Sequence, residues 1–266
     1  MQVVGYRTPD VGVYVAGDRE DDNTADVPDS DSHTRHRSVT FESFDSGREL
    51  SWSLGERHCA GVVTDEGHDA CDVPDAPYCE HHQSTWVCAR CTGTCLKDEM
   101  DCHDDHAVYL AAFAPDQFKV GVTKLWRLET RLREQGADRA AHIRTVDNGR
   151  IAREIESGLA AEIPDRVRVP KKIAGLDRAV DPTAWERLLA EFDPIETYDF
   201  DYGLSLSERP VAETLASGTV RGAKGRVVVI ENGGTSYAVD LRDLVGYELE
   251  PEATDRQLQS SLGAFG

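Results

Sequence analysis

The stretch Val108-Tyr-Leu-Ala-Ala-Phe-Ala-Pro-Asp-Gln-Phe-Lys-Val-Gly-Val-Thr123 decides the fold of this chain. Two apolar runs, 108–113 and 118–123, stand on either side of Pro115-Asp116, a pair that favours a turn. The stretch therefore predicts two successive strands joined by this turn.

The residues after this hairpin continue an α/β pattern. Leu125, Leu128 and Leu132 recur at helical spacing. A third apolar run follows at 141–146, and a second helical pattern then stops before Pro164. The order strand, strand, helix, strand, helix predicts one small α/β domain.

The two ends of the chain carry β patterns. Short strand-like runs occur before residue 57, and Glu231-Asn-Gly-Gly234 predicts a hairpin in the C-terminal part. Each part is too small to be stable alone, so we expect them to pair into one small β-barrel. An acidic insert at 18–37, rich in Asp and Ser, is interpreted as a mobile loop rather than a binding segment.

The chain is acidic and short of lysine. It has 29 Lys+Arg against 49 Asp+Glu, a formal net charge of -20, and its basic residues divide into 23 Arg and 6 Lys. This balance is typical of a halophilic protein in a cytosol with molar salt, where the Debye length falls to ~3 Å. Because such screening removes long-range repulsion, the acidity does not exclude a nucleic-acid partner.

The chain has no sequence signal for export or membrane insertion. Met1-Gln-Val-Val-Gly-Tyr-Arg7 lacks the basic start and long apolar core of a signal peptide. The longest apolar run, 107–114, is far shorter than a membrane span. We therefore expect a soluble, cytoplasmic protein without a membrane partner.

All seven cysteines lie between Cys59 and Cys102. In a cytoplasmic protein, closely spaced cysteines favour metal over disulfides, and an odd number cannot be fully paired within one chain. Cys88-x2-Cys91 and Cys79-x2-His82 have the spacing of zinc-binding turns. The cluster predicts zinc, with an iron–sulfur cluster as the chemical alternative.

The ligands suffice for two zinc ions with four ligands each. Our partition assigns Cys59, Cys71, Cys79 and His82 to one ion and Cys88, Cys91, Cys95 and Cys102 to the other, with His81, His103 and His106 as alternative ligands. Because four protein ligands close a zinc site, we expect both ions to be structural.

Residues 106–160 resemble the GIY-YIG nuclease superfamily. The matching motifs, in chain order, are Ala107-Val-Tyr109, Lys119-Val-Gly121 with Thr123, Arg131-Leu132, and Glu156 in Ala152-Arg-Glu-Ile-Glu156. The resemblance implies that Tyr109 activates the attacking water or receives its proton. It also implies that Arg131 stabilises the phosphate and that Glu156 holds a divalent metal such as Mg or Mn.

The match to this superfamily departs at one motif residue. Lys119 stands in place of the second motif's tyrosine, and the neighbouring Phe118 has no hydroxyl group. Together with the cysteines, Gln135-Gly-Ala137 and the segment Gly222 to Ile230 make most of the chain similar to an uncharacterised prokaryotic family. That wider resemblance implies no established activity.

These observations predict an α+β protein with three parts: a zinc-bound Cys-rich module, a GIY-YIG-like α/β domain and a β-barrel from both termini. The expected division is an N-terminal β segment at 1–57, a zinc module at 58–105, the GIY-YIG-like domain at 106–164, a helical connector at 165–210 and a C-terminal β segment at 211–266.

We expect a zinc protein that binds nucleic acid, with RNA or the ribosome favoured over DNA. Lys119, Lys124, Arg127 and Arg131 are the expected phosphate-binding residues; the last three form a helical stripe that is equally consistent with a solvated helix face. The alternatives are a metal-dependent endonuclease using Tyr109, Arg131 and Glu156, and a protein–protein adaptor.

Overall fold

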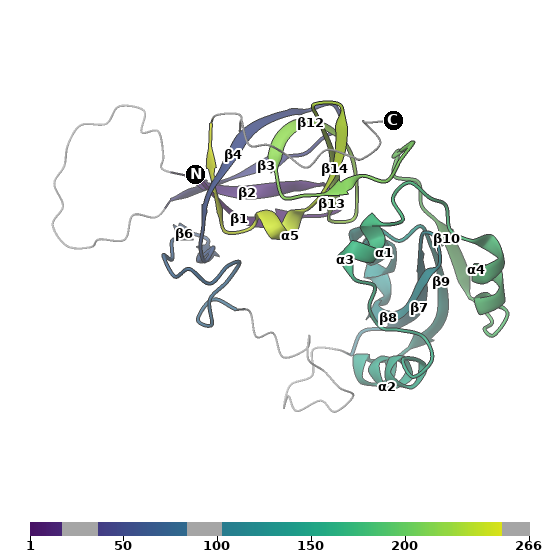
Figure 1. The fold of residues 1–266 in the computed structure, drawn as a ribbon. Helices are drawn as coiled ribbons and strands as arrows, with labels where there is room; N and C mark the ends of the chain where they lie inside the picture. Colours follow the sequence, from purple (N-terminus) through teal and green to yellow (C-terminus); the bar gives the residue numbers. More distant parts are fainter. Residues whose placement is uncertain (18–36, 84–102, 252–266) are drawn as a thin grey trace, which may run out of the picture.

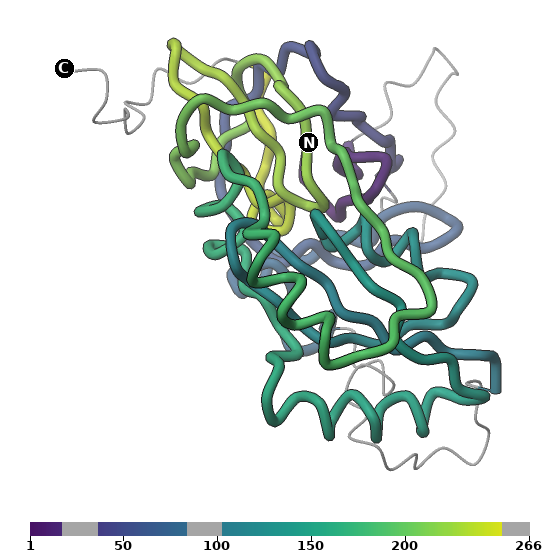
Figure 2. The backbone as a smooth tube through the Cα atoms, turned by 90° about the vertical axis from the view of Figure 1, so that its right-hand side faces the viewer, coloured from purple at the N-terminus to yellow at the C-terminus, as the bar shows by residue number. Residues whose placement is uncertain are grey.

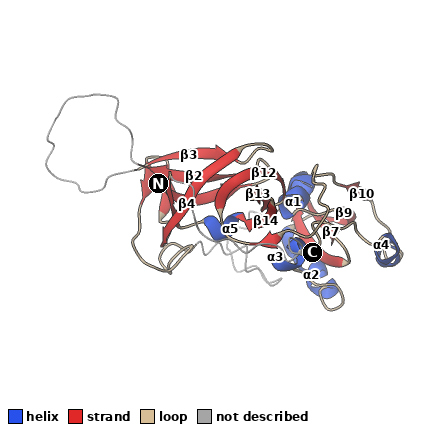
Figure 3. Cartoon of the chain, turned by 45° about the horizontal axis from the view of Figure 1, so that its top comes forward, coloured by secondary structure: helices blue, strands red, loops and turns tan. Residues whose placement is uncertain are grey.

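The structure, a computed structural model, describes residues 1–17, 37–83 and 103–251. These residues form a nine-stranded, a four-stranded and a two-stranded sheet. Figure 1 shows the two larger sheets side by side, and Figure 3 shows that α1 to α4 gather around the four-stranded one. The predicted α+β class is confirmed.

The nine-stranded sheet is built from both ends of the chain. Its N-terminal strands are β1 (Gln2–Arg7), β2 (Gly12–Gly17), β3 (Ser38–Ser43) and β4 (Glu49–Arg57), and its C-terminal strands are β11 (Val211–Ala212), β12 (Ala216–Lys224), β13 (Val227–Asn232), β14 (Thr235–Asp240) and β15 (Tyr247–Glu250). The order β11-β14-β13-β12-β4-β15-β1-β2-β3 interleaves the two groups. The expected pairing of the chain ends is confirmed.

The expected barrel, however, is not closed. A barrel requires hydrogen bonds between its first and last strands. Within the described residues β3 pairs only with β2, and β11, two residues long, pairs only with β14. The sheet therefore remains open, although its buried cluster draws on both chain ends, with Val3 and Leu50 beside Ile230 and Leu244.

The four-stranded sheet has the order β10-β9-β7-β8. Its elements are β7 (His106–Phe113), β8 (Gln117–Lys124), η2 (Leu125–Arg127), α1 (Leu128–Gln135), β9 (Arg139–Val146), α2 (Gly149–Leu159), α3 (Val169–Ile173), α4 (Pro182–Leu189) and β10 (Glu196–Asp199). The predicted alternation of strands and helices is confirmed. The segment 165–210, expected as a helical connector, also supplies β10, which pairs with β9.

The central strand β7 is buried along its whole length. Because side chains alternate between the two faces of a strand, both faces need a cover. One face, with Tyr109, packs on Leu128 and Leu132 of α1. The other, with Val108, packs on Ala152 of α2 and on α4. This two-sided burial explains why the run is continuously apolar rather than alternating.

The remaining described elements are short. They are α5 (Leu241–Leu244), which precedes β15, and the hairpin of β5 (Val62–Thr64) and β6 (Gly67–Asp69). Among all the residues that the structure describes, no helix is long and apolar enough to cross a membrane.

The two larger sheets meet where the end of α1 approaches the β12–β13 turn. Gly136 ends α1 with a φ of 70°, and Gly225 lies in the turn with a φ of 59°. A Cβ atom on Gly136 would stand 2.9 Å from the carbonyl oxygen of Lys224, and one on Gly225 would stand 2.7 Å from the backbone nitrogen of Gly136. Only glycine combines this backbone conformation with so close an approach.

An ion pair closes the same junction. Lys224 Nζ lies 2.6 Å from Oδ1 and 2.7 Å from Oδ2 of Asp138, which also accepts the Ala114 N–H at 2.9 Å. Next to this pair, Ile173 of α3 packs on Val229 of β13. Figure 2 shows the resulting arrangement, with the terminal strands above and the central segment below.

The junction predicts a penalty for a side chain at Gly136. Gly136→Ala should lower the free energy of unfolding by about 2–4 kcal/mol, because it adds a steric clash to the cost of a left-handed backbone. Gly233→Ala is the matched control, since Gly233 has a φ of 58° and nothing within 4 Å of an added Cβ. It should cost only about 1 kcal/mol. Equal losses in urea denaturation would contradict a close contact at the junction.

Candidate functional site

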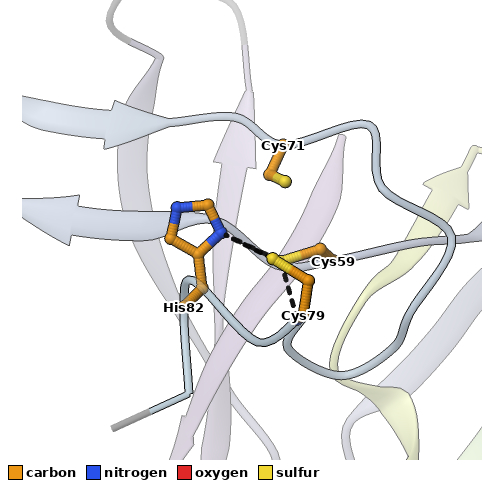
Figure 4. A group of neighbouring side chains, drawn as sticks. All are labelled: Cys59, Cys71, Cys79 and His82. Atoms are coloured by element: carbon orange, nitrogen blue, oxygen red, sulfur yellow. Dashed lines mark hydrogen bonds between the residues drawn. The ribbon is translucent and has the colours of Figure 1, made fainter.

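The structure brings together the first predicted ligand set. Cys59 follows β4, Cys71 follows β6, and Cys79 and His82 come from the next turn (Figure 4). One ligand atom from each of the four lies within 4.8 Å of the others. The group can therefore hold a metal ion with three sulfur ligands and one nitrogen ligand.

Local hydrogen bonds shape this cluster. The backbone N–H groups of His82 and Gln83 both donate to the Cys79 carbonyl oxygen, at 3.0 and 2.9 Å, and so fold the turn. As a result His82 Nδ1 lies 3.3 Å from the sulfur of Cys59 and 3.3 Å from that of Cys79. The Cys79 N–H also points at the Cys59 sulfur, at 3.3 Å.

The nine-stranded sheet holds the loops that carry these ligands. Gln2 of β1 is fully buried, and its Nε2 donates to the carbonyl oxygens of Cys59 and Gly246, each at 3.2 Å. The His58 ring bonds the Cys71 carbonyl oxygen through Nδ1 at 2.9 Å. Because these anchors come from several strands, the cluster depends on the assembled sheet.

The other predicted metal ligands fall into two groups. His81 is exposed, and His106 begins β7 with its Nδ1 2.7 Å from the Asp104 carbonyl oxygen. Within the described residues neither of these nor His103 belongs to the cluster. The second expected set, Cys88, Cys91, Cys95 and Cys102, lies outside the described residues.

A second constellation surrounds Tyr109 on β7. This side chain is 1% exposed and stands opposite Gly121 on β8. A Cβ atom on Gly121 would lie 2.6 Å from the Tyr109 hydroxyl, so the glycine leaves the space that the tyrosine ring occupies. Gln135 Nε2 donates to that hydroxyl at 2.6 Å. Burial raises the pKa of Tyr109, against the nearby charge of Arg131, so the phenol is protonated at neutral pH.

Lys119 of β8 belongs to the same constellation. Its Nζ lies 5.9 Å from the centroid of the Tyr109 ring. Burial first, and the like charge of Arg131 second, lower the pKa of Lys119 to about 8, whereas Glu156 acts to raise it. Tyr109, Lys119, Arg131 and Glu156 are therefore electrostatically connected.

The predicted basic stripe divides into two parts. Arg127, the last residue of η2, and Arg131 of α1 lie on one side, because both bind Glu134, at 2.9 and 3.2 Å. Lys124 instead ends β8 and pairs with Asp104 at 2.8 Å. Beside Arg127 the indole of Trp126 is 72% exposed, with the guanidinium carbon 5.8 Å from its ring centroid. Sequence reasoning missed this tryptophan.

Glu156, the expected ligand for a divalent metal, is already paired. Its Oε2 lies 2.7 Å from Nη1 of Arg153, and the side chain is mostly buried. The one group of three or more Cys, His, Asp or Glu ligands found in the described residues is the Cys59 cluster. The residues around Glu156 therefore do not form a multidentate cation site.

A cavity of about 720 Å³ opens between the two larger sheets. Its basic lining consists of Arg7, Arg131, Arg168, Lys172, Lys224 and Arg226, accompanied by the carboxylates of Glu134 and Asp240. Sequence reasoning identified only Arg131 of these basic residues. The others come from β1, the start of α3, and the β12–β13 hairpin, which are far apart in the chain.

Lys172 is the most strongly perturbed lysine of this lining. Its Nζ donates to the Gln135 carbonyl oxygen at 2.7 Å and lies 4.2 Å from the centroid of the Phe113 ring. Burial first, and then the positive charges of Lys119, Arg226, Arg131 and Lys224, lower the pKa of Lys172 to about 7. The cavity therefore holds cations that repel one another.

Comparison with known proteins gives one match. The family described as "Protein of unknown function (DUF2797)" matches residues 71–249. Comparisons with curated proteins and with solved structures gave no match. The matched range contains the four-stranded sheet, three of the four ligands in the metal cluster, and α3 with the β12–β13 hairpin.

The lowered pKa of Lys172 predicts a pH-dependent stability. Below about pH 7 the folded chain bears the full cost of its buried charge. As the pH rises from about 7 towards 10.5, the folded state releases this proton while the unfolded state keeps it. The stability of the wild type relative to Lys172→Met should therefore rise across this window, as measured by chemical denaturation.

Lys171→Met is the control for this measurement, because Lys171 is the exposed neighbour on the same helix. Its stability difference from the wild type should change little with pH. If the stability difference between the wild type and Lys172→Met does not change with pH over the same window, the amine is not buried in its charged form.

Proposed function

This chain belongs to the DUF2797 family, and from the geometry of its own residues we propose that it is a zinc protein that binds nucleic acid. RNA is the favoured ligand, held through its phosphates and unpaired bases. The observation that carries this proposal is the exposed Trp126 beside Arg127, which shares Glu134 with Arg131.

Zinc suits the cluster of Cys59, Cys71, Cys79 and His82. Ligands about 2.3 Å from a tetrahedral zinc stand about 3.8 Å apart, which agrees with the 4.8 Å limit of the cluster. Three thiolates with one imidazole form a common zinc set, whereas iron–sulfur clusters are usually held by four thiolates. Since all four positions are protein ligands, the metal would hold the loops after β4 and β6 together.

The start of α1 supports recognition of a single strand. An exposed indole offers a face on which an unpaired base stacks, and cationic side chains beside it attract the flanking phosphates. Trp126 has this exposure; Arg127 is its neighbour in η2, and Arg131 lies on α1, the helix that follows. In a chain with a net charge of -20, these arginines stand beside a predominantly basic cavity.

RNA is favoured over DNA for a physical reason. Proteins that recognise RNA sequence mostly contact single-stranded loops and ends, whose bases are free to stack on aromatic side chains. The resemblance of residues 106–160 to the GIY-YIG superfamily supports phosphate binding at Arg131.

A second candidate function, phosphodiester cleavage, is favoured by the pKa of Lys119. With a pKa of about 8, its amine is partly neutral near pH 8 and could accept the proton of an attacking water. The water oxygen would bond to phosphorus while the bond to the leaving oxygen breaks, with Arg131 stabilising the charge. Because Glu156 is paired with Arg153, we derive no step through a divalent metal.

Binding to labelled single-stranded RNA and DNA tests the proposal. Trp126→Ala should weaken RNA binding about 10- to 100-fold, as expected for the loss of one stacked base. Arg131→Ala should weaken it as well. Arg133→Ala is the matched control on the same helix, because Arg133 pairs with Glu129 at 3.0 Å rather than with Glu134. Fluorescence anisotropy at about 0.1 and 1 M salt measures all four proteins.

The same samples decide between binding and cleavage. Strand cleavage that disappears in Tyr109→Phe and Lys119→Met would replace a pure binding function with catalysis. Dependence of that cleavage on Mg²⁺ or Mn²⁺ and on Glu156 would restore the metal mechanism implied by the superfamily. If the protein has no affinity for RNA or DNA at either salt concentration, the remaining alternative is a protein–protein adaptor.

Elemental analysis tests the zinc assignment. The full chain should contain about two zinc ions, and Cys79→Ser should lose one of them, because three ligands hold zinc far more weakly than four. His81→Ala should keep both, since this neighbouring histidine is exposed and outside the cluster. Loss of zinc from His81→Ala, or retention by Cys79→Ser, would overturn the ligand assignment.

A further inference from the structure

We propose that the cavity between the two larger sheets binds a phosphate monoester on a ligand of nucleotide size. This site is distinct from the exposed tryptophan and uses mainly residues of α3 and the β12–β13 hairpin. The inference rests on the proposed function for the nature of the ligand, either a free mononucleotide or the phosphorylated end of a strand.

The charge of the cavity opposes the charge of the whole chain. Six basic side chains line it against two carboxylates, although the chain carries a net charge of -20. Lysine is rare in this protein, yet three of the five lysines in the described residues, Lys119, Lys172 and Lys224, interact in this region. A field this concentrated attracts an anion even when the protein as a whole is acidic.

Four of the six cations have acidic partners and two do not. The ion pairs are Arg7 with Asp10, Arg131 with Glu134, Lys224 with Asp138 and Arg226 with Asp240. Within the described residues, Lys172 donates only to a carbonyl oxygen, and Arg168 forms no ion pair. A dianion placed between them would therefore neutralise charge that the protein leaves uncompensated.

An orphaned donor supports the same conclusion. The Nε atom of Arg226 is buried and has no hydrogen-bond partner within the described residues. A buried donor without a partner costs free energy, and an acceptor oxygen from a ligand would satisfy it. Arginine is well suited to this task because its planar fork matches the geometry of phosphate.

The charge and the volume together favour a monoester. A phosphate monoester carries about -1.5 to -2 at pH 7, compared with -1 for each phosphodiester along a strand. The cavity volume of about 720 Å³ lies within the range of about 300–1,000 Å³ for small-ligand pockets. A single nucleotide fits that range, with the phosphate directed at Lys172 and Arg168.

Gln135 connects this cavity with the constellation around Tyr109. Its carbonyl oxygen accepts the hydrogen bond from Lys172, and its side chain donates to the Tyr109 hydroxyl. Gln135 and Arg131 both line the cavity. A phosphate in the cavity would thus lie next to the residues proposed to bind the strand.

Ligand binding should be coupled to the protonation of Lys172. The charged groups around it come from every neighbouring element. They are Arg168 just before α3, Arg7 on β1, Lys119 on β8, Arg131 and Glu134 on α1, Lys224 and Arg226 on the β12–β13 hairpin, and Asp240 at the end of β14. Since most of these are cations, an incoming anion favours the charged amine and raises its pKa. Binding then takes up a proton, and affinity falls as the pH rises above about 7.

Isothermal titration calorimetry with the full chain tests this site. The probes are AMP, adenosine, and an RNA octamer with either a 5′-phosphate or a 5′-hydroxyl end. AMP should bind and adenosine should not. Lys172→Gln should weaken AMP binding at least tenfold, and Lys171→Gln, the exposed neighbour, should leave it unchanged. AMP affinity should also fall between about pH 7 and pH 9, by up to about tenfold for each pH unit over which one proton is taken up.

Two further measurements keep the test decisive. Arg168→Gln, at an exposed position, should also weaken AMP binding, which covers the case in which Lys172→Gln folds poorly. Tighter binding of the 5′-phosphorylated octamer identifies the strand end as the ligand, and equal binding of the two octamers identifies the free nucleotide. Absence of AMP binding together with equal octamer binding would overturn the proposal.

The failure of this inference is distinguishable from that of the proposed function. Trp126→Ala should weaken binding of the octamers without changing AMP affinity, because Trp126 does not line the cavity. AMP binding without any RNA binding would refute the proposed function and keep the cavity site. RNA binding without any AMP binding, and equal for the two octamers, would refute the cavity site and keep the proposed function.

Discussion

The close backbone approach between the end of α1 and the β12–β13 turn is the constraint on which the rest of the structure depends. Gly136 and Gly225 make it sterically feasible, and the ion pair between Lys224 and Asp138 holds it. Removing one partner of such a buried pair typically costs about 3–5 kcal/mol. Because this contact joins the two larger sheets, it also sets the walls of the basic cavity. The segments noted at the sequence level, Gln135-Gly-Ala137 and Gly222 to Ile230, are thus two sides of one contact.

The metal cluster is organised by a different part of the fold. It sits at the ends of strands of the nine-stranded sheet, with Gln2 and His58 fixing the backbone of two of its ligands. Its role in our proposal is to hold loops that have little apolar core of their own. In the cavity proposed to bind phosphate, by contrast, Lys172, Lys224 and Arg226 are partly buried cations. Salt screens partly buried charges less than surface charges, so these cations would still attract an anion at high ionic strength.

The sequence predicted those features that depend on local pattern. The strands β7 to β9, helices α1 and α2, and the ligand set from Cys59 to His82 all follow from periodicity or short spacing. Strand β12 was missed because Ala216-Ser-Gly-Thr-Val-Arg-Gly-Ala-Lys224 has little apolar alternation. It is a strand because β4 and β13 pair with it on both sides. The expected barrel failed for the same reason, since closure depends on which edges meet rather than on the pattern of any one strand.

The sequence by itself determined the α+β class and the grouping of Cys59, Cys71, Cys79 and His82, which depend on hydrophobic period and on the reach of short loops. The pairing of the chain ends was an expectation that only the tertiary structure decided, because it joins strands far apart in the chain. Only the tertiary structure decided that Lys172, Lys224 and Arg226 share a cavity with Arg131, and that Trp126 stays exposed. Such groupings arise when distant segments pack together, and the packing in turn sets the burial and the like charges that lower the pKa of Lys119 and Lys172.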